Sequence, residues 1–261
     1  MAAPAVAQDA GEQPALALMG TVPIYWGEPA DFGETLQGEA EPHWARAVLE
    51  QGFALAPVDY LSEEVLAGYD YLLLAQPRGL SAEENVALDT WVREGGRLLL
   101  FADPLMTGES RFGIGDRRRP QDVALLSPIL ARWGLELTFD EAQAEGLQQA
   151  DHFGDPLPVN MRGAWDYSGA TRECTIPGDA LLAHCRIGAG QALLVADAAM
   201  LDIAGPYPHA ESALTWLLEH GLGIARENMP QSGDSSREIV GTVGLGSETS
   251  ENRREQVSGE R

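Results

Sequence analysis

Short apolar runs alternate with amphipathic segments along the first half of the chain. Residues 71–77 (YLLLAQP) and 97–103 (RLLLFAD) contain continuous apolar runs of strand length, which are typical of strands buried on both faces of a parallel sheet. Between them, Ser81 and Glu84 have the spacing of a capping box, apolar positions recur at helical spacing, and Gly95 ends the pattern. Two buried strands joined by such a helix predict a right-handed βαβ crossover.

The same patterns predict further elements on both sides of this unit. Strands are expected at 15–19, 53–61, 135–140 and within 188–202, and helices at 42–52, 62–70, 127–133 and 209–221. Ser127 is expected to cap its helix, and Gly221 to end the last helix. The segment 104–126 shows neither the helical nor the strand periodicity, which predicts a long irregular loop. Such loops after a strand are often functional. Residues 140–170 are polar and rich in Gly and Pro, which predicts loops or an inserted lobe.

These elements form one predicted α/β domain at 15–225. Residues 1–14 are either a disordered terminus or the remnant of a signal peptide, because Ala5-Val6-Ala7 has the form of a cleavage site but no apolar segment precedes it. Residues 226–261 are rich in Gly, Ser, Glu and Arg without periodicity, which predicts a disordered tail. Because no apolar run reaches the roughly 18 residues that a membrane span needs, we expect no direct membrane insertion.

The charge of the chain narrows the choice of partners. Forty Asp and Glu residues against 17 Lys and Arg give a formal net charge of -23. Such a surface repels phosphate backbones and anionic lipid headgroups, so we expect no nucleic acid as a partner. Neutral or cationic ligands and protein partners stay open. The simpler interpretation, which we favour, is that the acidity serves solubility.

The chain has two cysteines, Cys174 and Cys185, on either side of a segment that is typical of a short hairpin. In an oxidising compartment they could form a disulfide across it, whereas in a reducing one they would be two buried thiols. Of the two interpretations, the sequence slightly favours the thiols. The spacing of the two cysteines, with His184 as the one histidine beside them, argues against a zinc site.

Three stretches together resemble a known family. They are YDYLLLAQPRGLSAEENVALDTWVREGGRLLLFADPL, LSPILARWGLEL and GAGQALLVADAAMLD, and the likeness covers roughly residues 15–223. They are similar to the glutamine-amidotransferase-like domain of ABC-type transport auxiliary proteins, the group that includes gliding-motility-associated components. The resemblance implies a flavodoxin-like three-layer sandwich of the class I glutamine-amidotransferase type, with a mainly parallel sheet. It also implies a periplasmic or membrane-associated accessory of a transporter, with the cytoplasm as the alternative location.

The resemblance also implies that amide cleavage is lost. In class I amidotransferases one strand ends in a nucleophilic Cys and a later strand in a His that Glu soon follows, whereas the matching positions here read Ala102-Asp103 and Ala196-Asp197. Acyl transfer by that route needs a thiolate and a base within hydrogen-bond reach. We therefore expect a module that is not an enzyme and needs no cofactor, and that binds transporter subunits, another membrane protein or a small polar ligand.

Asp103 and Asp197 are the first candidate site residues, because each follows the apolar run of a predicted strand. Ligands of open α/β sheets lie beyond the carboxyl ends of the strands. If the two strands are neighbours, the carboxylates could share Mg²⁺ or Ca²⁺, and the chain could be a metal-dependent hydrolase of a carbohydrate or phosphate-type substrate. The simpler interpretation, which we favour, is that each Asp caps the turn that follows it.

Two further groups complete the candidate site. Tyr25, Trp26 and Glu28 follow the first strand. The aromatic pair beside the carboxylate could stack on a sugar or enclose a cation, or Trp26 could simply pack over the end of the sheet. Arg111 and Arg117–Arg119 place positive charge in the long loop, where they could receive an acidic partner or pair with the protein's own carboxylates. We favour self-pairing.

Two histidines, His43 and His209, lie near predicted helix starts. A lone His at such a position is more often structural than catalytic, so we expect both to be structural.

Overall fold

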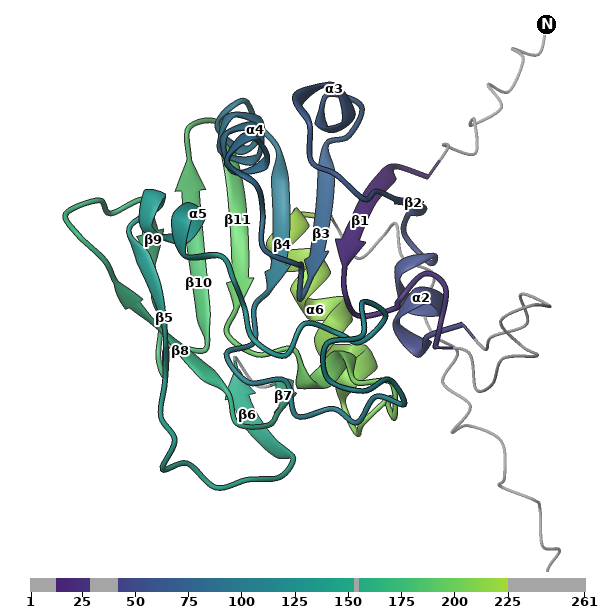
Figure 1. Cartoon of the computed structure of the whole chain (residues 1–261). Helices are drawn as coiled ribbons and strands as arrows, with labels where there is room; N and C mark the ends of the chain where they lie inside the picture. Colours follow the sequence, from purple (N-terminus) through teal and green to yellow (C-terminus); the bar gives the residue numbers. More distant parts are fainter. Residues whose placement is uncertain (1–12, 29–41, 153–154, 225–261) are drawn as a thin grey trace, which may run out of the picture. The chain divides into compact units, whose positions relative to one another are not determined.

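The computed structural model describes residues 13–28, 42–152 and 155–224 (Figure 1). All of them belong to one compact unit, Met1–Pro230. Apart from residues 13 and 14, the predicted terminal segment 1–14 lies outside the described residues, and so does the predicted tail 226–261.

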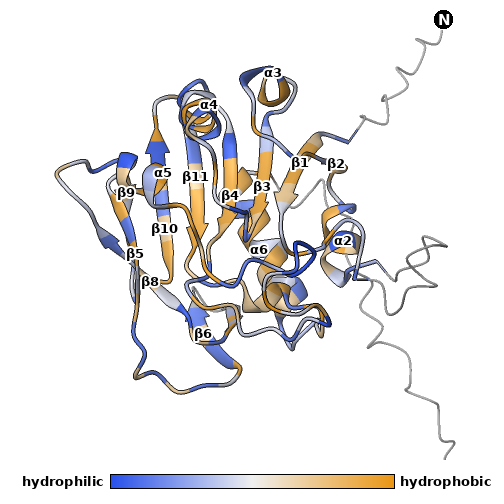
Figure 2. Cartoon of the chain, viewed as in Figure 1, coloured by the Kyte–Doolittle hydropathy of each residue, from blue (hydrophilic) through white to orange (hydrophobic). Residues whose placement is uncertain are grey.

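Within these ranges a seven-stranded sheet forms the centre of the molecule, in the order β2-β1-β3-β4-β11-β10-β9. The strands are β1 (Ala15–Gly20), β2 (Ala54–Pro57), β3 (Tyr71–Ala75), β4 (Arg97–Phe101), β9 (Cys174–Thr175), β10 (Leu182–Ile187) and β11 (Gly190–Val195). The first five strands of this order pair in parallel, and β10 and β9 complete the sheet antiparallel. The apolar runs lie in the middle of the sheet, where Figure 2 shows its strands as hydrophobic, so the predicted mainly parallel sheet is confirmed.

Helices cover both faces of this sheet. They are α2 (Trp44–Leu49), α3 (Glu63–Leu66), α4 (Ala82–Arg93), α5 (Ser127–Arg132), the 3-10 turn η1 (Ala199–Leu201) and α6 (Ala210–Leu222). α6 packs on β4 and β11, with α2 beside it, while α4 packs against β11 with α3 and α5 as its neighbours. Figure 1 shows α6 behind the sheet and α4 in front of it.

The unit β3-α4-β4 forms as the sequence predicts. The Ser81 hydroxyl accepts a hydrogen bond from the backbone N–H of Glu84, and the Glu84 carboxylate accepts one from the N–H of Ser81, so the capping box is complete. β3 and β4 are parallel neighbours, with Leu73 opposite Leu99. The reciprocal cap satisfies two of the donors that a helix start leaves unpaired, and it fixes where α4 begins.

Two predicted helix ends are wrong. Ser127 lies inside the first turn of α5 and makes no capping hydrogen bond, because the N-cap is one residue earlier, at Leu126. Gly221 does not end the last helix but lies within it, and Gly223, with a φ of 68°, forms the C-cap. A Cβ atom at Gly221 would lie only 3.1 Å from the Leu193 Cβ, so this glycine allows the close approach of α6 to the sheet.

Residues 135–167 form the inserted lobe that was one of two expectations. β5 (Leu135–Phe139) pairs antiparallel with β8 (Gly163–Tyr167), and β6 (Gln148–His152) pairs antiparallel with β7 (Asp155–Val159). The strand predicted at 135–140 is confirmed, but it belongs to this lobe and not to the central sheet. β7 contacts α6 and η1, which places the lobe beside the ends of the core strands.

The two cysteines form a disulfide, so the interpretation as two buried thiols is wrong. Cys174 on β9 lies directly opposite Cys185 on β10 in the antiparallel pair, which confirms the predicted hairpin. Because residues that face each other across two strands have adjacent Cβ atoms, the pairing brings the two sulfur atoms within bonding distance.

Candidate functional site

The carboxyl ends of β1, β3, β4 and β11 all point to one side of the sheet, because these strands are parallel. This carboxyl edge lies at the bottom of the sheet in Figure 1. The loop 104–126, η1 and the hairpin β6-β7 gather beside it. Ligands of open α/β sheets bind at such an edge.

Asp103 follows β4 and is completely buried. Its Oδ1 accepts a hydrogen bond of 2.8 Å from the N–H of Leu105, and its Oδ2 accepts one of 3.0 Å from the N–H of Ala198. The first bond caps its own turn, and the second crosses to the segment after the neighbouring strand β11. Asp103 therefore fastens two loops at the carboxyl edge.

Asp197 has the same role one strand away. It is 1% exposed, its Oδ1 accepts a 2.7 Å hydrogen bond from the N–H of Ala199, and its Oδ2 accepts one of 3.0 Å from the N–H of Asn160 in the inserted lobe. Capping, the interpretation favoured for both aspartates, is confirmed. In the part of the chain that the structure describes, no group of three or more His, Cys, Asp or Glu side chains is placed to hold a metal ion.

Burial changes the protonation of both carboxyls. It raises the pKa of Asp103 to about 6, against the opposing effect of the two N–H donors. Burial, and then the negative charge of Asp103, raise the pKa of Asp197 well above its ordinary value, although the N–H donors of Asn160 and Ala199 and the charge of Arg162 lower it. The pair therefore holds protons at a higher pH than exposed aspartates do.

Gln76 is a site residue for which the sequence gives no signal. It follows β3, is completely buried and has a φ of 47°. Its Nε2 donates to the carbonyl oxygens of Asp103 and Gln121, and its Oε1 accepts from the N–H of Asp103 at 2.8 Å. The Thr21 hydroxyl, which follows β1, donates to the Gln76 carbonyl and accepts from the N–H of Gln121. The chain's own loop 104–126 is thus fastened over the ends of β1 and β3.

The alternative that Trp26 packs over the end of the sheet is wrong, whereas Tyr25 is partly buried and packs against the hydrophobic core. Trp26 is 71% exposed. The rings of Tyr25 and Trp26 make an edge-to-face contact, with their centroids 4.7 Å apart. The Arg46 guanidinium lies over the Tyr25 ring, 4.5 Å from its centroid. Glu28 accepts a 2.8 Å hydrogen bond from the Ser110 hydroxyl in the long loop. The Trp26 ring therefore lies at the surface, while Asp103 lies in the interior.

Several arginines of the long loop make contacts within the loop itself. Arg118 pairs with Asp116 at 2.7 Å, and Arg119 pairs with Asp122 at 2.8 Å. The guanidiniums of Arg118 and Arg111 lie over the ring of Phe112, at 4.1 and 5.2 Å from its centroid. Self-pairing is therefore confirmed for Arg118 and Arg119.

His43 is structural, as predicted. Its Nδ1 accepts from the N–H of Ala45 at the start of α2, its Nε2 bonds the Leu201 carbonyl of η1, and burial lowers its pKa. It joins α2 to the carboxyl edge. His209 occupies the N-cap position of α6 without a side-chain capping bond.

A cavity of about 280 Å³ opens at the carboxyl edge beside Asp197. It is lined by Thr107, Glu109, Leu147, Asn160, Ala199, Asp202, Ala204 and Tyr207. The Tyr207 hydroxyl donates a 2.6 Å hydrogen bond to Asp202, and burial, followed by that carboxylate, raises the pKa of Tyr207. Carboxylates, a phenol and a hydroxyl suit a ligand rich in hydroxyl or ammonium groups and disfavour anions. The sequence could not predict this cavity, because its lining comes from separate segments.

Part of the chain matches a known protein family. Residues 29–150 match the family model of an ABC-type uncharacterized transport system. No curated protein matches the chain. Among solved structures, an exo-beta-1,4-mannosidase from Opitutaceae bacterium strain TAV5 is 16% identical with a TM-score of 0.47, and the match covers 78% of this chain but 35% of the mannosidase. The chain therefore spans about a third of that relative's length.

Two shorter structures are similar over most of their own length. The mmIFT52 N-terminal domain is 13% identical with a TM-score of 0.48, and the match covers 82% of this chain and 99% of that domain. A cytoplasmic protein from Salmonella typhimurium is 14% identical with a TM-score of 0.40, and the match covers 77% and 97%. Likenesses at this level carry no inference about function.

Proposed function

We propose that the chain is a non-catalytic, amidotransferase-like accessory module of an ABC-type transport system, which binds a protein partner or a small polar ligand. The observation that carries the proposal is the match of residues 29–150 to a transport-system family. The segment includes the helix α4 and both flanking strands, which form the centre of the domain.

The order of the strands supports the finer description of the fold. The sequence β2-β1-β3-β4 followed by β11 is the order of flavodoxin-like doubly wound sheets, if β11 is counted as the fifth parallel strand. The class I amidotransferase relationship rests on the resemblance of the sequence.

The environment of the strand ends supports a role without acyl transfer. Such chemistry needs an activated nucleophile beside a base. At the ends of β4 and β11, Asp103 and Asp197 are buried and each accepts two backbone hydrogen bonds. Both cysteines are joined in the disulfide, and the ring of His43 is bonded on both nitrogens.

The disulfide supports a place outside the cytoplasm, because such bonds persist in oxidising compartments. We therefore propose a periplasmic or membrane-associated location, with a transporter subunit or another membrane protein as the partner. Among the helices of the described ranges, none is long and apolar enough to cross a bilayer.

The test is recovery of the partner from native membranes with the tagged chain as bait. We expect a subunit of an ABC-type transporter to be recovered, and an excess of untagged chain to displace it. If untagged chain displaces no transporter subunit from the bait, the proposed accessory role is wrong.

The alternative is a metal-dependent hydrolase of a carbohydrate or phosphate-type substrate, with Asp103 and Asp197 as metal ligands. The adjacency of the two carboxyls on β4 and β11 is the observation in its favour. A thermal-shift series with Mg²⁺, Ca²⁺ and Mn²⁺ separates the two proposals. Stabilisation by one of these ions that is lost in Asp103→Asn would favour the hydrolase, and indifference to all three favours the accessory module.

A further inference from the structure

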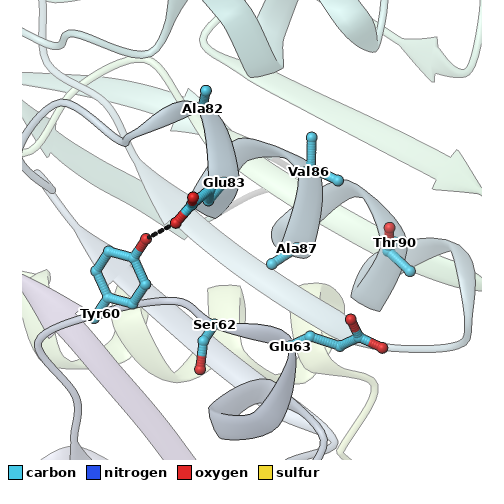
Figure 3. A pocket seen from close by; sticks show the side chains of 8 residues that line it. All are labelled: Tyr60, Ser62, Glu63, Ala82, Glu83, Val86, Ala87 and Thr90. Atoms are coloured by element: carbon cyan, nitrogen blue, oxygen red, sulfur yellow. Dashed lines mark hydrogen bonds between the residues drawn. The ribbon is translucent and has the colours of Figure 1, made fainter.

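A groove of about 440 Å³ lies between α3 and α4, on the side of the molecule away from α6 (Figure 3). It is lined by Tyr60, Ser62, Glu63, Ala82, Glu83, Val86, Ala87 and Thr90. The Tyr60 hydroxyl donates a 3.0 Å hydrogen bond to Glu83 across one end of the groove. Ser62 caps α3 by accepting from the N–H of Val65, so the walls of the groove are set by hydrogen bonds of the fold itself.

The groove has apolar surface that the core does not cover. Val86 is 67% exposed and Tyr60 is 41% exposed, whereas the inward face of α4 is fully packed through residues such as Leu88 and Val92. An amphipathic helix of this kind normally carries polar residues on its outer face. An exposed branched apolar side chain and an exposed aromatic ring in the lining of one groove are typical of a contact surface.

The rim of the groove is acidic. Glu63 and Glu83 line it, and Glu64 adds a second carboxylate to the first turn of α3. The guanidinium of Arg78 is engaged by Glu84 at 2.7 and 2.9 Å through both of its terminal nitrogens. With a net charge of -23 on the whole chain, the groove attracts cationic groups and repels anionic ones.

We propose that this groove docks a basic segment of a partner protein, in which apolar side chains that enter between α3 and α4 are flanked by Lys or Arg residues that meet Glu63 and Glu83. The inference rests on the proposed function, because it names the chemistry of the protein partner of that accessory module. The groove also lies wholly within the segment 29–150 that matches the transport-system family.

The test uses a synthetic 15-residue amphipathic peptide with Leu at helical spacing and Lys on both sides of the apolar stripe, together with the same peptide carrying Glu in place of Lys. Binding is followed on the isolated chain by backbone amide shifts and by fluorescence anisotropy. We expect the Lys peptide to shift the amides of α3 and α4 and the Glu peptide to bind nowhere. Affinity should fall with added salt, because exposed charges are screened.

Three variants separate specific docking from general attraction to an acidic protein. Val86→Asn should weaken the Lys peptide about tenfold, because the contact buries a Val side chain. Glu63→Gln with Glu83→Gln should weaken it mainly at low salt. The matched control is Ile114→Asn, which removes an apolar side chain that is 89% exposed in the loop 104–126 and should change the affinity less than twofold.

Three results would overturn the docking proposal. The first is equal affinity of the chain for the Lys and Glu peptides, and the second is equal affinity of Val86→Asn and the wild type for the Lys peptide. The third is a dimer, seen by sedimentation, that Val86→Asn dissociates, because a second copy of the chain would then occupy the groove. The peptide test needs no transporter, so its failure is distinct from failure of the membrane pull-down. If both proposals hold, Val86→Asn also loses the transporter subunit while Ile114→Asn retains it.

Discussion

A single buried side chain, Gln76, joins the ends of β3 and β4 to the loop 104–126. Its amide satisfies the N–H and the carbonyl of Asp103 and the carbonyl of Gln121. Gln76→Ala removes the partner of the Asp103 N–H and of the Gln121 carbonyl, while the Asp103 carbonyl keeps the N–H of Ala124. We therefore expect the free energy of unfolding to fall by about 2–4 kcal/mol. Urea unfolding followed by circular dichroism measures it.

The matched control for this prediction is Gln148→Ala. Gln148 is exposed, and its amide donates only to the carbonyl of Ala144. We expect its loss to change the free energy of unfolding by less than about 0.5 kcal/mol. Similar losses for the two variants would show that the amide network of Gln76 is not what holds the loop.

At this scale the sequence predicts positions better than contacts. Asp103 and Asp197 could be placed at strand ends, because each follows an apolar run of strand length, but only the structure shows that the two strands are neighbours. Their partners Ala198 and Asn160 could not, because both bonds depend on how distant segments meet. Gln76 has no local signature at all, since only the three-dimensional structure shows which backbone groups its amide reaches.

At the scale of elements, Asp89 joins α4 to the segment that follows it in the same layer. Its carboxylate accepts from Arg93 within α4, from Arg132 in α5 and from the indole N–H of Trp133, each at about 3 Å. Burial raises the pKa of Asp89, but these bonds outweigh it and the net effect lowers the pKa. The side chain therefore acts as a charged link between two helices.

We expect Asp89→Asn to lower the free energy of unfolding by about 2 kcal/mol. The substitution removes the negative charge and places an amide N–H group against the N–H donors of Arg93, Arg132 and Trp133. Because the two arginines are partly exposed, the loss of stability is smaller than for a fully buried ion pair. Asp70→Asn, at an exposed position, should change it by less than about 0.5 kcal/mol. Equal midpoints in urea for wild type and Asp89→Asn would contradict this role.

The disulfide links β9 to β10 at the antiparallel border of the sheet. It closes a loop with a sequence separation of 11 residues, for which the chain-entropy model predicts a contribution of about 2–3 kcal/mol. We expect a reducing agent to lower the melting temperature of the wild type and to leave that of Cys174→Ala with Cys185→Ala unchanged. A reductant effect of the same size in both proteins would show that it acts elsewhere.

Elements differ in how far the sequence predicts them. α4 could be predicted in full, because capping box, helical period and terminal Gly all agree. The hairpin β6-β7 of the lobe could not be predicted, although β5 could. β7 carries Pro156 and Pro158, which disfavour a strand in local terms and are tolerated where a strand lies at an edge. Ser127 shows the limit for helix starts, since a shift by one residue removes its cap.

For the whole molecule, the titrating groups predict how stability depends on pH. Burial raises the pKa of Asp103 from 3.8 to about 6, so its contribution is fully present below pH 3.8 and is lost as the pH rises through about 6. Asp197 acts in the same direction. Burial raises the pKa of Glu84, but its bonds to Arg78, Ser81 and Leu61 lower it from 4.5 to about 2, so its contribution is lost only as the pH falls through about 2.

We therefore expect Asp103 alone to lower the stability by about 2 kcal/mol between pH 4.5 and pH 7, while His43, whose pKa burial lowers, acts in the opposite direction. Urea unfolding across this range measures the slope, and Asp103→Asn should flatten it while Asp70→Asn should leave it unchanged. Repulsion among surface carboxylates at a net charge of -23 also lowers the stability as the pH rises. About 0.5 M NaCl screens this surface repulsion but does not screen the interaction of the buried pair. A slope that disappears in salt and is equal in both variants would therefore assign the pH dependence to the acidic surface and not to the strand ends.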